Sequence, residues 1–228
     1  MVRLIMTILA FGCSVAHGAE TVDPGNHLDN IPFSYPGLVA KHLGVECINH
    51  AFCGNSNENI FHGAMEYIPK VGKISALIVG WTSTERETWH CDGRTWQFIP
   101  SWCSSRKSIW KQFAYYKEGT RSVEAPQQCA DEEQHIKTLS EFYSLLLRYK
   151  FDHDEYNKKR NHYRSALQAY CATRNIRLIE TCWYEPMKDA VDLGKIGAWY
   201  PWTSETSRHP NREEHQLFAD KIIEHYKL

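Results

Sequence analysis

The sequence predicts an α/β fold: a three-layer sandwich in which a mostly parallel central sheet is flanked by helices. Apolar runs of strand length alternate along the chain with amphipathic helical patterns, and this alternation is typical of parallel strands joined by helices on both faces. The length of 228 residues suits one domain with a sizeable core. We therefore predict a single domain over residues 1–228, with an aromatic-rich insertion at about residues 82–130.

Four apolar stretches have the length and composition of buried strands. The third has the clearest signal, because Ile74, Leu77 and Val79 fall in a short run flanked by glycines. The four predicted strands are Leu4–Phe11, Val45–Asn49, Lys73–Trp81 and Ile176–Trp183.

Helical patterns separate these strands. In the closing helix, Asn211 can cap the first turn, and acidic residues follow where the helix dipole favours them. Its side chains expected to face inward are Leu217, Phe218, Ile222 and Ile223. The other predicted helices are Pro36–Leu43, Asn55–Ile68, a long segment from Asp131, and Asp154–Thr173, with loops at His17–Tyr35 and Gly194–Thr206.

The stretch from Thr82 to Ala130 is rich in Trp, Phe and Tyr and has no clear period. Aromatic side chains commonly line ligand clefts, so the stretch is interpreted as a cap that forms part of a substrate groove. A hydrophobic subcore or a partner surface explains the same composition equally well.

The first residues admit two interpretations. Arg3, an apolar run and small residues up to Ala19 form the pattern of a cleaved secretory signal. The same run suits a buried strand that ends in a tight turn at Gly12 and exposes the hydroxyl of Ser14. Because a candidate base, His209, precedes the last helix, the sequence favours the strand. We expect a cytoplasmic or virion-associated protein, with secretion after cleavage near residue 19 as the alternative.

Charge, hydropathy and cysteine spacing exclude several classes of protein. Lys+Arg 26 against Asp+Glu 27 leaves a net charge of −1, so no overall field attracts nucleic acid or anionic lipid. No apolar run approaches the roughly 20 residues that span a bilayer. The eight cysteines are dispersed without a Cys-x-x-Cys pair, which favours free buried thiols and does not support a metal site. We expect no cofactor or metal, and no nucleic-acid or membrane partner.

Four short motifs follow one another along the chain. They are Gly12-Cys13-Ser14, the segment from Asn49 to Gly54, Gly80-Trp81-Thr82, and His209-Pro210. In order and spacing they resemble the Gly-Asp-Ser, Asn-x-x-x-x-Gly, Gly-x-Asn and Asp-x-x-His-Pro blocks of the SGNH (GDSL-like) hydrolase superfamily, most closely its small, divergent members often found in bacteriophage genomes. The resemblance implies an SGNH/flavodoxin-like sheet with its site at the carboxyl ends of the strands.

The resemblance also implies roles for individual residues. Ser14 would be the nucleophile and His209 the base that takes its proton; His17, His50 and His215 are secondary candidates for the base. The donors to the oxyanion would be the backbone N–H groups of Ser14 and Gly54 and a third donor from Thr82, or else from Asn55 or Asn57.

Three positions depart from the family pattern. Cys13 replaces the Asp before the nucleophile, Thr82 replaces the Asn of the third block, and Thr206 replaces the Asp that orients the histidine. Glu205 is an adjacent candidate for that orienting role, and a Ser-His dyad is the working hypothesis. Trp81 and Arg86 are candidates for substrate binding, although an arginine here also suits a structural ion pair.

The predicted function is hydrolysis of a carboxyl ester, such as an O-acetyl group on a carbohydrate, through an acyl-enzyme at Ser14. The departures at Thr82 and Thr206 also fit an alternative of another class, a non-catalytic binding or structural protein of a phage that keeps the sheet. The sequence does not determine the acyl group, the leaving group or the oligomeric state.

Overall fold

The structure of the chain is a computed structural model that describes residues 6–19, 21–22, 28–84, 86–91, 94–98, 114–117, 120–123, 141, 145, 152–183, 187–193 and 209–228. The chain forms two compact units. Met1–Ser83 and Tyr163–Leu228 make up the first unit, and Thr84–His162 make up the second. The predicted sheet lies in the first unit.

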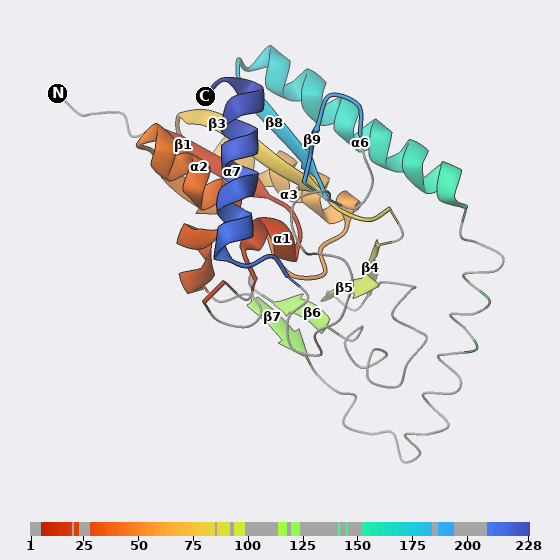
Figure 1. The fold of residues 1–228 in the computed structure, drawn as a ribbon. Coiled ribbons are helices and arrows are strands. Elements are labelled where there is room, and N and C mark those ends of the chain that lie inside the picture. Colours follow the sequence, from red (N-terminus) through yellow and green to blue (C-terminus); the bar gives the residue numbers. More distant parts are fainter. Residues whose placement is uncertain are drawn as a thin grey trace. The chain divides into compact units, whose positions relative to one another are not determined.

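The sheet of the first unit has five parallel strands in the order β2-β1-β3-β8-β9 (Figure 1). Its strands are β1 (Thr7–Phe11), β2 (Glu46–Asn49), β3 (Ile74–Trp81), β8 (Arg177–Cys182) and β9 (Val191–Asp192). β1 pairs with β2 on one side and β3 on the other, and all five of its residues are buried. The predicted α/β class is confirmed, and so is the interpretation of the first apolar run as a buried strand.

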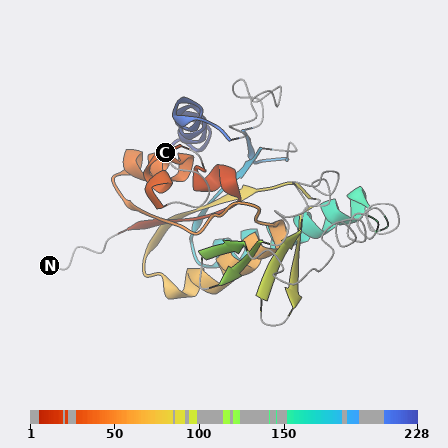
Figure 2. The same cartoon turned by 90° about the horizontal axis from the view of Figure 1, so that it is seen from below.

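Helices cover both faces of this sheet. They are α1 (Ser14–His17), α2 (Tyr35–Leu43), α3 (Asn57–Tyr67), α6 (His153–Thr173) and α7 (Arg212–Tyr226), with 3-10 turns η1 (Leu28–Phe33) and η2 (Ile68–Lys70). Figure 2 shows the sheet edge-on, with α2 and α7 on one side and α3 on the other.

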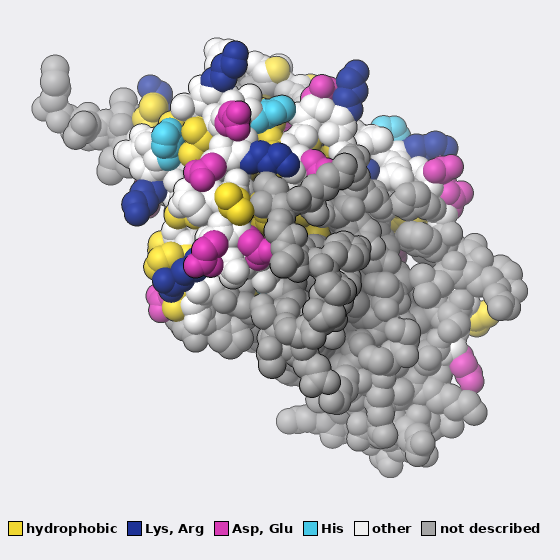
Figure 3. All heavy atoms as spheres, in the orientation of Figure 1, with side chains coloured by type: hydrophobic (Ala, Val, Ile, Leu, Met, Phe, Trp, Pro, Cys, Tyr) yellow, Lys and Arg dark blue, Asp and Glu magenta, His cyan; other side chains and the backbone are white. Residues whose placement is uncertain are grey.

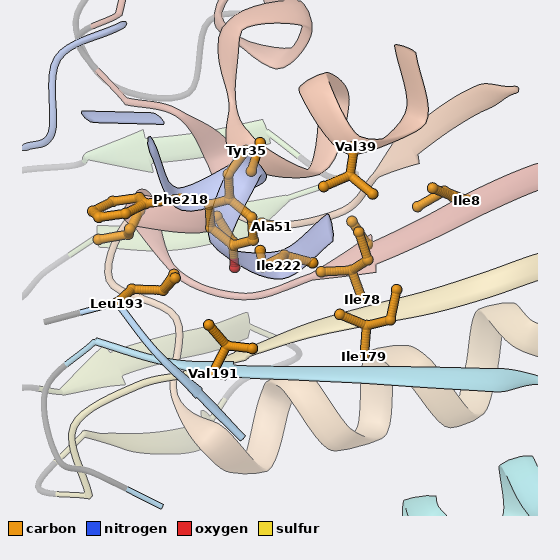
Figure 4. Packing of buried hydrophobic residues seen from close by; sticks show 14 of the residues in the cluster. Ile8, Tyr35, Val39, Ala51, Ile78, Ile179, Val191, Leu193, Phe218 and Ile222 are labelled. Carbon is orange, nitrogen blue, oxygen red and sulfur yellow. The ribbon is translucent and has the colours of Figure 1, made fainter. Parts of the chain in front are cut away.

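The alternation of side chains along β1 explains the two layers, because successive residues of a strand point to opposite faces. Ile8 packs in the cluster formed with α2 and α7 (Figure 4), and Ala10 belongs to the same cluster. Leu9 and Phe11 pack in the cluster formed with α3 and α6. A continuous apolar run is therefore what a central strand of this sheet requires.

Two local predictions are wrong. The segment His17–Tyr35 was expected to be a loop, but it contains the 3-10 turn η1. In α7, Leu217 was expected to face inward and is instead 50% exposed. The buried positions of α7 are His215, Phe218, Ala219 and Ile222. This spacing defines a helical stripe that begins at a histidine and leaves Leu217 outside it.

The second unit contains an antiparallel sheet that the sequence did not predict. Its strands are β4 (Glu87–Cys91), β5 (Arg94–Phe98), β6 (Ala114–Lys117) and β7 (Thr120–Val123), in the order β4-β5-β6-β7. The register places the aromatic positions Trp89 and Tyr115 opposite Trp96, and aromatic residues have a high preference for strands. The aromatic composition of this stretch thus accompanies β-structure.

Several predictions fall on residues that the structure does not describe. The long helix from Asp131 is described only at positions 141 and 145, both helical. The loop Gly194–Thr206 lies outside the described residues. The role of the insertion as a cap stays a prediction.

The described surface carries charges of both signs. Basic and acidic side chains are mixed over the described part of the face in Figure 3. No helix within the described ranges is long and apolar enough to cross a membrane. Among the described residues, Cys13, Cys47, Cys53, Cys171 and Cys182 form no disulfide.

Candidate active site

The turn after β1 holds Ser14 at the carboxyl edge of the sheet. A Cβ at Gly12 would lie 2.4 Å from the Ala16 Cβ and 3.2 Å from the Gly80 carbonyl oxygen, so a glycine is needed for α1 to pack this closely on β3. Ser14 is the first residue of α1 and is 5% exposed. The expectation that the turn exposes its hydroxyl openly is therefore wrong, because this close packing buries all of α1.

The loop after β2 is hydrogen-bonded to the same turn. The Gly12 carbonyl oxygen accepts the side-chain Nδ2–H of Asn55 at 3.0 Å and the backbone N–H of Phe52 at 3.2 Å. From α1, the Nδ1 of His17 donates to the Ala51 carbonyl oxygen at 2.8 Å. These bonds join the loop to the backbone on both sides of Ser14.

Gly54 lies in this loop with a left-handed backbone, at φ +83°. L-residues with a Cβ rarely adopt this conformation. No described atom lies within 4 Å of the position that a Cβ would take, so the Gly54 Cα borders open space rather than packed side chains. Gly54 itself is buried.

Asn57 fixes the end of β3 against the start of α3. Its Oδ1 accepts the Thr82 N–H at 2.9 Å, and its Nδ2 donates to the Thr82 carbonyl oxygen at 3.0 Å. The amide groups of Asn55 and Asn57 are thus both engaged with backbone, as expected for buttresses of the turn. The Thr82 hydroxyl is buried and has no hydrogen-bond partner among the described residues. A buried hydroxyl of this kind lowers the stability of the fold unless a ligand or a water molecule forms a hydrogen bond with it.

α7 brings the segment that carries His209 to the same edge. The Arg212 side chain at the start of α7 donates to the carbonyl oxygen of Thr21, just beyond α1, at 3.0 Å. At the other end of α7, the Tyr226 carbonyl oxygen accepts a hydrogen bond from the side chain of Arg177, the first residue of β8. α7 therefore runs antiparallel to the strands and begins at their carboxyl edge. His209 lies two residues before its N-cap, Asn211.

His215, in the first turn of α7, is fully buried. Its Nδ1 accepts the Tyr35 N–H at 3.3 Å, and its ring stacks on the Tyr35 ring at 6.2 Å between centroids. Burial and, to a lesser extent, the neighbouring His209 lower the pKa of His215 from 6.5 to about 3. His215 is therefore neutral at physiological pH, with its proton on Nε2.

We expect this histidine to destabilise the fold in acid. Because the pKa of His215 is about 3 in the folded state and 6.5 as the ordinary value, the unfolded chain binds the proton first as the pH falls. The stabilisation that the buried, neutral His215 contributes is complete above pH 6.5 and is lost as the pH falls from 6.5 toward 3. Between pH 7 and 4.5 the loss is about 2–3 kcal/mol, measurable by urea unfolding. His215→Phe should flatten this slope and His225→Phe, an exposed position on the same helix, should not; equal slopes in all three proteins would contradict the assignment.

Other predicted site residues have these positions. Trp81 is 1% exposed, and its Nε1 donates to Glu180 at 2.9 Å, so it lies in the core. Cys13 is buried and accepts the Trp183 Nε1–H at 3.0 Å. The His50 ring stacks on the Phe11 ring and contacts the Tyr67 ring at a tilt. Arg86 belongs to the second unit, and Glu205 and Thr206 lie outside the described residues.

Sequence reasoning missed two residues of this region. Glu180 was not singled out, although a carboxylate within an otherwise apolar strand is a signal for a buried, paired charge. His215 was considered only as a substitute base, although its spacing from Phe218 and Ile222 already indicated an inward position.

Comparison with known proteins identifies no sequence family. No family model matches the chain, and no curated protein matches it. Among solved structures, the chain is similar to two proteins assigned to the lipolytic G-D-S-L family. One is from Desulfitobacterium hafniense DCB-2 (11% identity, TM-score 0.38, covering 96% of this chain and 99% of that chain). The other is from Veillonella parvula DSM 2008 (12% identity, TM-score 0.35, 96% and 97%).

A third similar structure is that of a carbohydrate esterase whose active site is described as having divergent catalytic and non-catalytic binding functions. Its identity is 12%, its TM-score 0.43, and the match covers 99% of this chain and 70% of that chain. Likenesses at this level do not determine chemistry.

Proposed function

We propose that the chain is a serine hydrolase that cleaves a carboxyl ester, such as an O-acetyl group on a carbohydrate, with Ser14 as nucleophile and His209 as general base. The observation that carries the proposal is the joining of three backbone segments at one sheet edge. Asn55 ties the loop of Gly54 to the turn of Ser14, and Asn57 ties Thr82 to the start of α3. Such bracing holds donors in place before a substrate binds, which is what stabilisation of an oxyanion requires.

The reaction proceeds in two halves. His209 takes the proton of the Ser14 hydroxyl while the oxygen attacks the ester carbonyl carbon. The carbonyl oxygen becomes an oxyanion that accepts the N–H groups of Ser14 and Gly54 and the hydroxyl of Thr82. The C–O bond of the ester breaks, and the leaving alcohol takes the proton from His209. Water, activated by the same histidine, then releases the acid from the acyl-enzyme.

Thr82 is the preferred third donor because the alternatives are engaged. The Nδ2 groups of Asn55 and Asn57 donate to backbone carbonyl oxygens, whereas the Thr82 hydroxyl has no partner among the described residues. A hydroxyl can donate one hydrogen bond, which suffices for one position of an oxyanion hole.

One observation favours the alternative, a binding or structural protein without catalysis. Ser14 is only 5% exposed. A reacting hydroxyl has to meet a substrate carbon, so the enzyme requires that Ser14 be reachable in solution.

Labelling with a fluorophosphonate tests the proposal. The probe bonds to activated serines, so we expect wild-type protein to be labelled and mass spectrometry to place the label on the peptide that contains Ser14. Ser14→Ala and His209→Ala should remove the label. Ser75→Ala is the matched control: its hydroxyl donates to the Thr7 carbonyl oxygen at 3.0 Å, at the other end of β3, and it should label as wild type does. A folded wild type that stays unlabelled would favour the binding protein.

A further inference from the structure

Arg212 is an exposed arginine whose side chain is nevertheless held in one place. It is the first residue of α7, and its Nε–H donates to the Thr21 carbonyl oxygen at 3.0 Å. Its guanidinium lies over the ring of Phe33, the last residue of η1, with the Cζ 3.8 Å from the ring centroid. An arginine anchored at its Nε and on one face of its plane loses little further freedom when a ligand binds.

The terminal amino groups of Arg212 take no part in the bond to Thr21. Within the described ranges, neither Nη1 nor Nη2 has a hydrogen-bond acceptor, and no carboxylate forms an ion pair with the guanidinium. Glu214, in the same turn, accepts the Asn211 N–H at 2.8 Å in the capping box. A guanidinium whose Nε is occupied still offers a parallel pair of N–H donors, which matches the two oxygens of a carboxylate.

Two successive turns connect this guanidinium to the proposed nucleophile. The Gly18 N–H donates to the Ser14 carbonyl oxygen at 3.1 Å, and the Thr21 N–H donates to the Gly18 carbonyl oxygen at 3.1 Å. The helical turn spans about 6 Å and the ends of the second turn lie within about 7 Å, so the Cα atoms of Ser14 and Thr21 are at most about 13 Å apart. His209 is three residues before Arg212, which limits their Cα separation to about 10 Å.

We propose that Arg212 binds a carboxylate of the substrate, so that the ester cleaved at Ser14 belongs to an acidic carbohydrate. Nη1–H and Nη2–H donate side by side to the two carboxylate oxygens. At the separations given above, the carboxylate lies on the sugar next to the one that carries the ester. The inference rests on the proposed function and adds a substrate class to it. Arg212 is a binding residue and takes no part in proton transfer.

Two disaccharides that differ in one charge test the inference. Each carries an O-acetyl group on one sugar, and the other sugar is either glucuronic acid or its primary amide, which has the same shape without the charge. We expect wild-type protein to release acetate from the acid with a kcat/KM about 10-fold higher than from the amide, the effect of a hydrogen bond to a charged group. In Arg212→Gln this preference should disappear through a higher KM for the acid at unchanged kcat, because the bound substrate and the transition state share the interaction.

Arg174→Gln is the matched control. Arg174 is also exposed, and its Cζ lies 4.8 Å from the centroid of the Tyr170 ring, but it follows α6 and precedes the amino end of β8. This variant should keep the wild-type preference for the acid. Arg212→Lys, which keeps the charge and loses the paired donors, should retain only part of the preference. Added salt should lower kcat/KM for the acid and leave the amide unchanged.

Calorimetry with Ser14→Ala separates binding from turnover. Ser14→Ala should bind the acid more tightly than the amide, and Ser14→Ala/Arg212→Gln should bind the two equally. If wild type is not labelled by the fluorophosphonate and releases no acetate, the proposed function fails, while calorimetry still decides whether the carboxylate site exists. Equal kcat/KM for both esters in wild type, or an equal loss on both in Arg212→Gln, would overturn the inference and leave Arg212 as a clamp between α7 and η1. Should Arg212→Gln not fold, the two esters compared in wild type and Arg212→Lys decide.

Discussion

Replacing Glu180 with alanine is expected to lower the free energy of unfolding by about 3–5 kcal/mol. Glu180 lies in β8 and is 5% exposed. Its Oε1 accepts the Trp81 Nε1–H at 2.9 Å and the Arg164 Nε–H at 2.8 Å, and its Oε2 accepts the Gln168 Nε2–H at 2.6 Å. One carboxylate thus joins β3, β8 and α6, and its removal leaves the Arg164 charge, 13% exposed, without compensation.

Part of this loss of stability should be recovered when the charge of Arg164 is removed as well. Replacing Glu180 and Arg164 together with leucine should cost less than Glu180→Ala, because no buried charge is then left unpaired. Glu155→Ala is the matched control, since the Glu155–Lys158 ion pair is exposed on the same helix, and no measurable change is expected there. Denaturant unfolding at pH 7 measures all three. A Glu180→Ala protein as stable as wild type would show that the network contributes nothing.

Replacing Thr82 with valine is expected to separate activity from stability. If its hydroxyl donates to the oxyanion, the labelling rate should fall by about 10²–10³-fold, the usual effect of losing one such donor. The free energy of unfolding should stay the same or rise, because the substitution removes a buried hydroxyl that no described residue satisfies. The backbone bonds to Asn57 do not involve this side chain and should keep Thr82 in place.

Thr181→Val is the matched control for Thr82→Val. Thr181 is equally buried, but its hydroxyl bonds to the Tyr35 hydroxyl at 2.9 Å, so the same substitution should destabilise the protein. Thr82→Ser, which keeps a hydroxyl, should retain most of the labelling rate. Wild-type rates in Thr82→Val would assign the third donor elsewhere and remove Thr82 from the site.

Much of the first unit is predictable from local patterns. The apolar runs of β1, β3 and β8 and the cap at Asn211 match the structure closely. These signals come from residues that are close together in the sequence. The spacing of their apolar side chains indicates directly whether a segment forms a helix or a strand. The second unit was not predicted in this way, because its strands are short and their aromatic residues suit a ligand cleft, a subcore or a strand equally well.

The sequence by itself determined that a parallel sheet forms, and it placed Ser14, Gly54, Thr82 and His209 in segments that follow strands or precede the last helix. Tertiary structure alone decided which polar groups meet. The Tyr35 N–H and the His215 ring are 180 residues apart in sequence, and the Asn57 side chain reaches the Thr82 backbone across 25 residues. Hydrogen bonds of this kind depend on how helices pack on the sheet, and no local period encodes that packing. For this reason the buried donor of His215 became visible only in the folded chain.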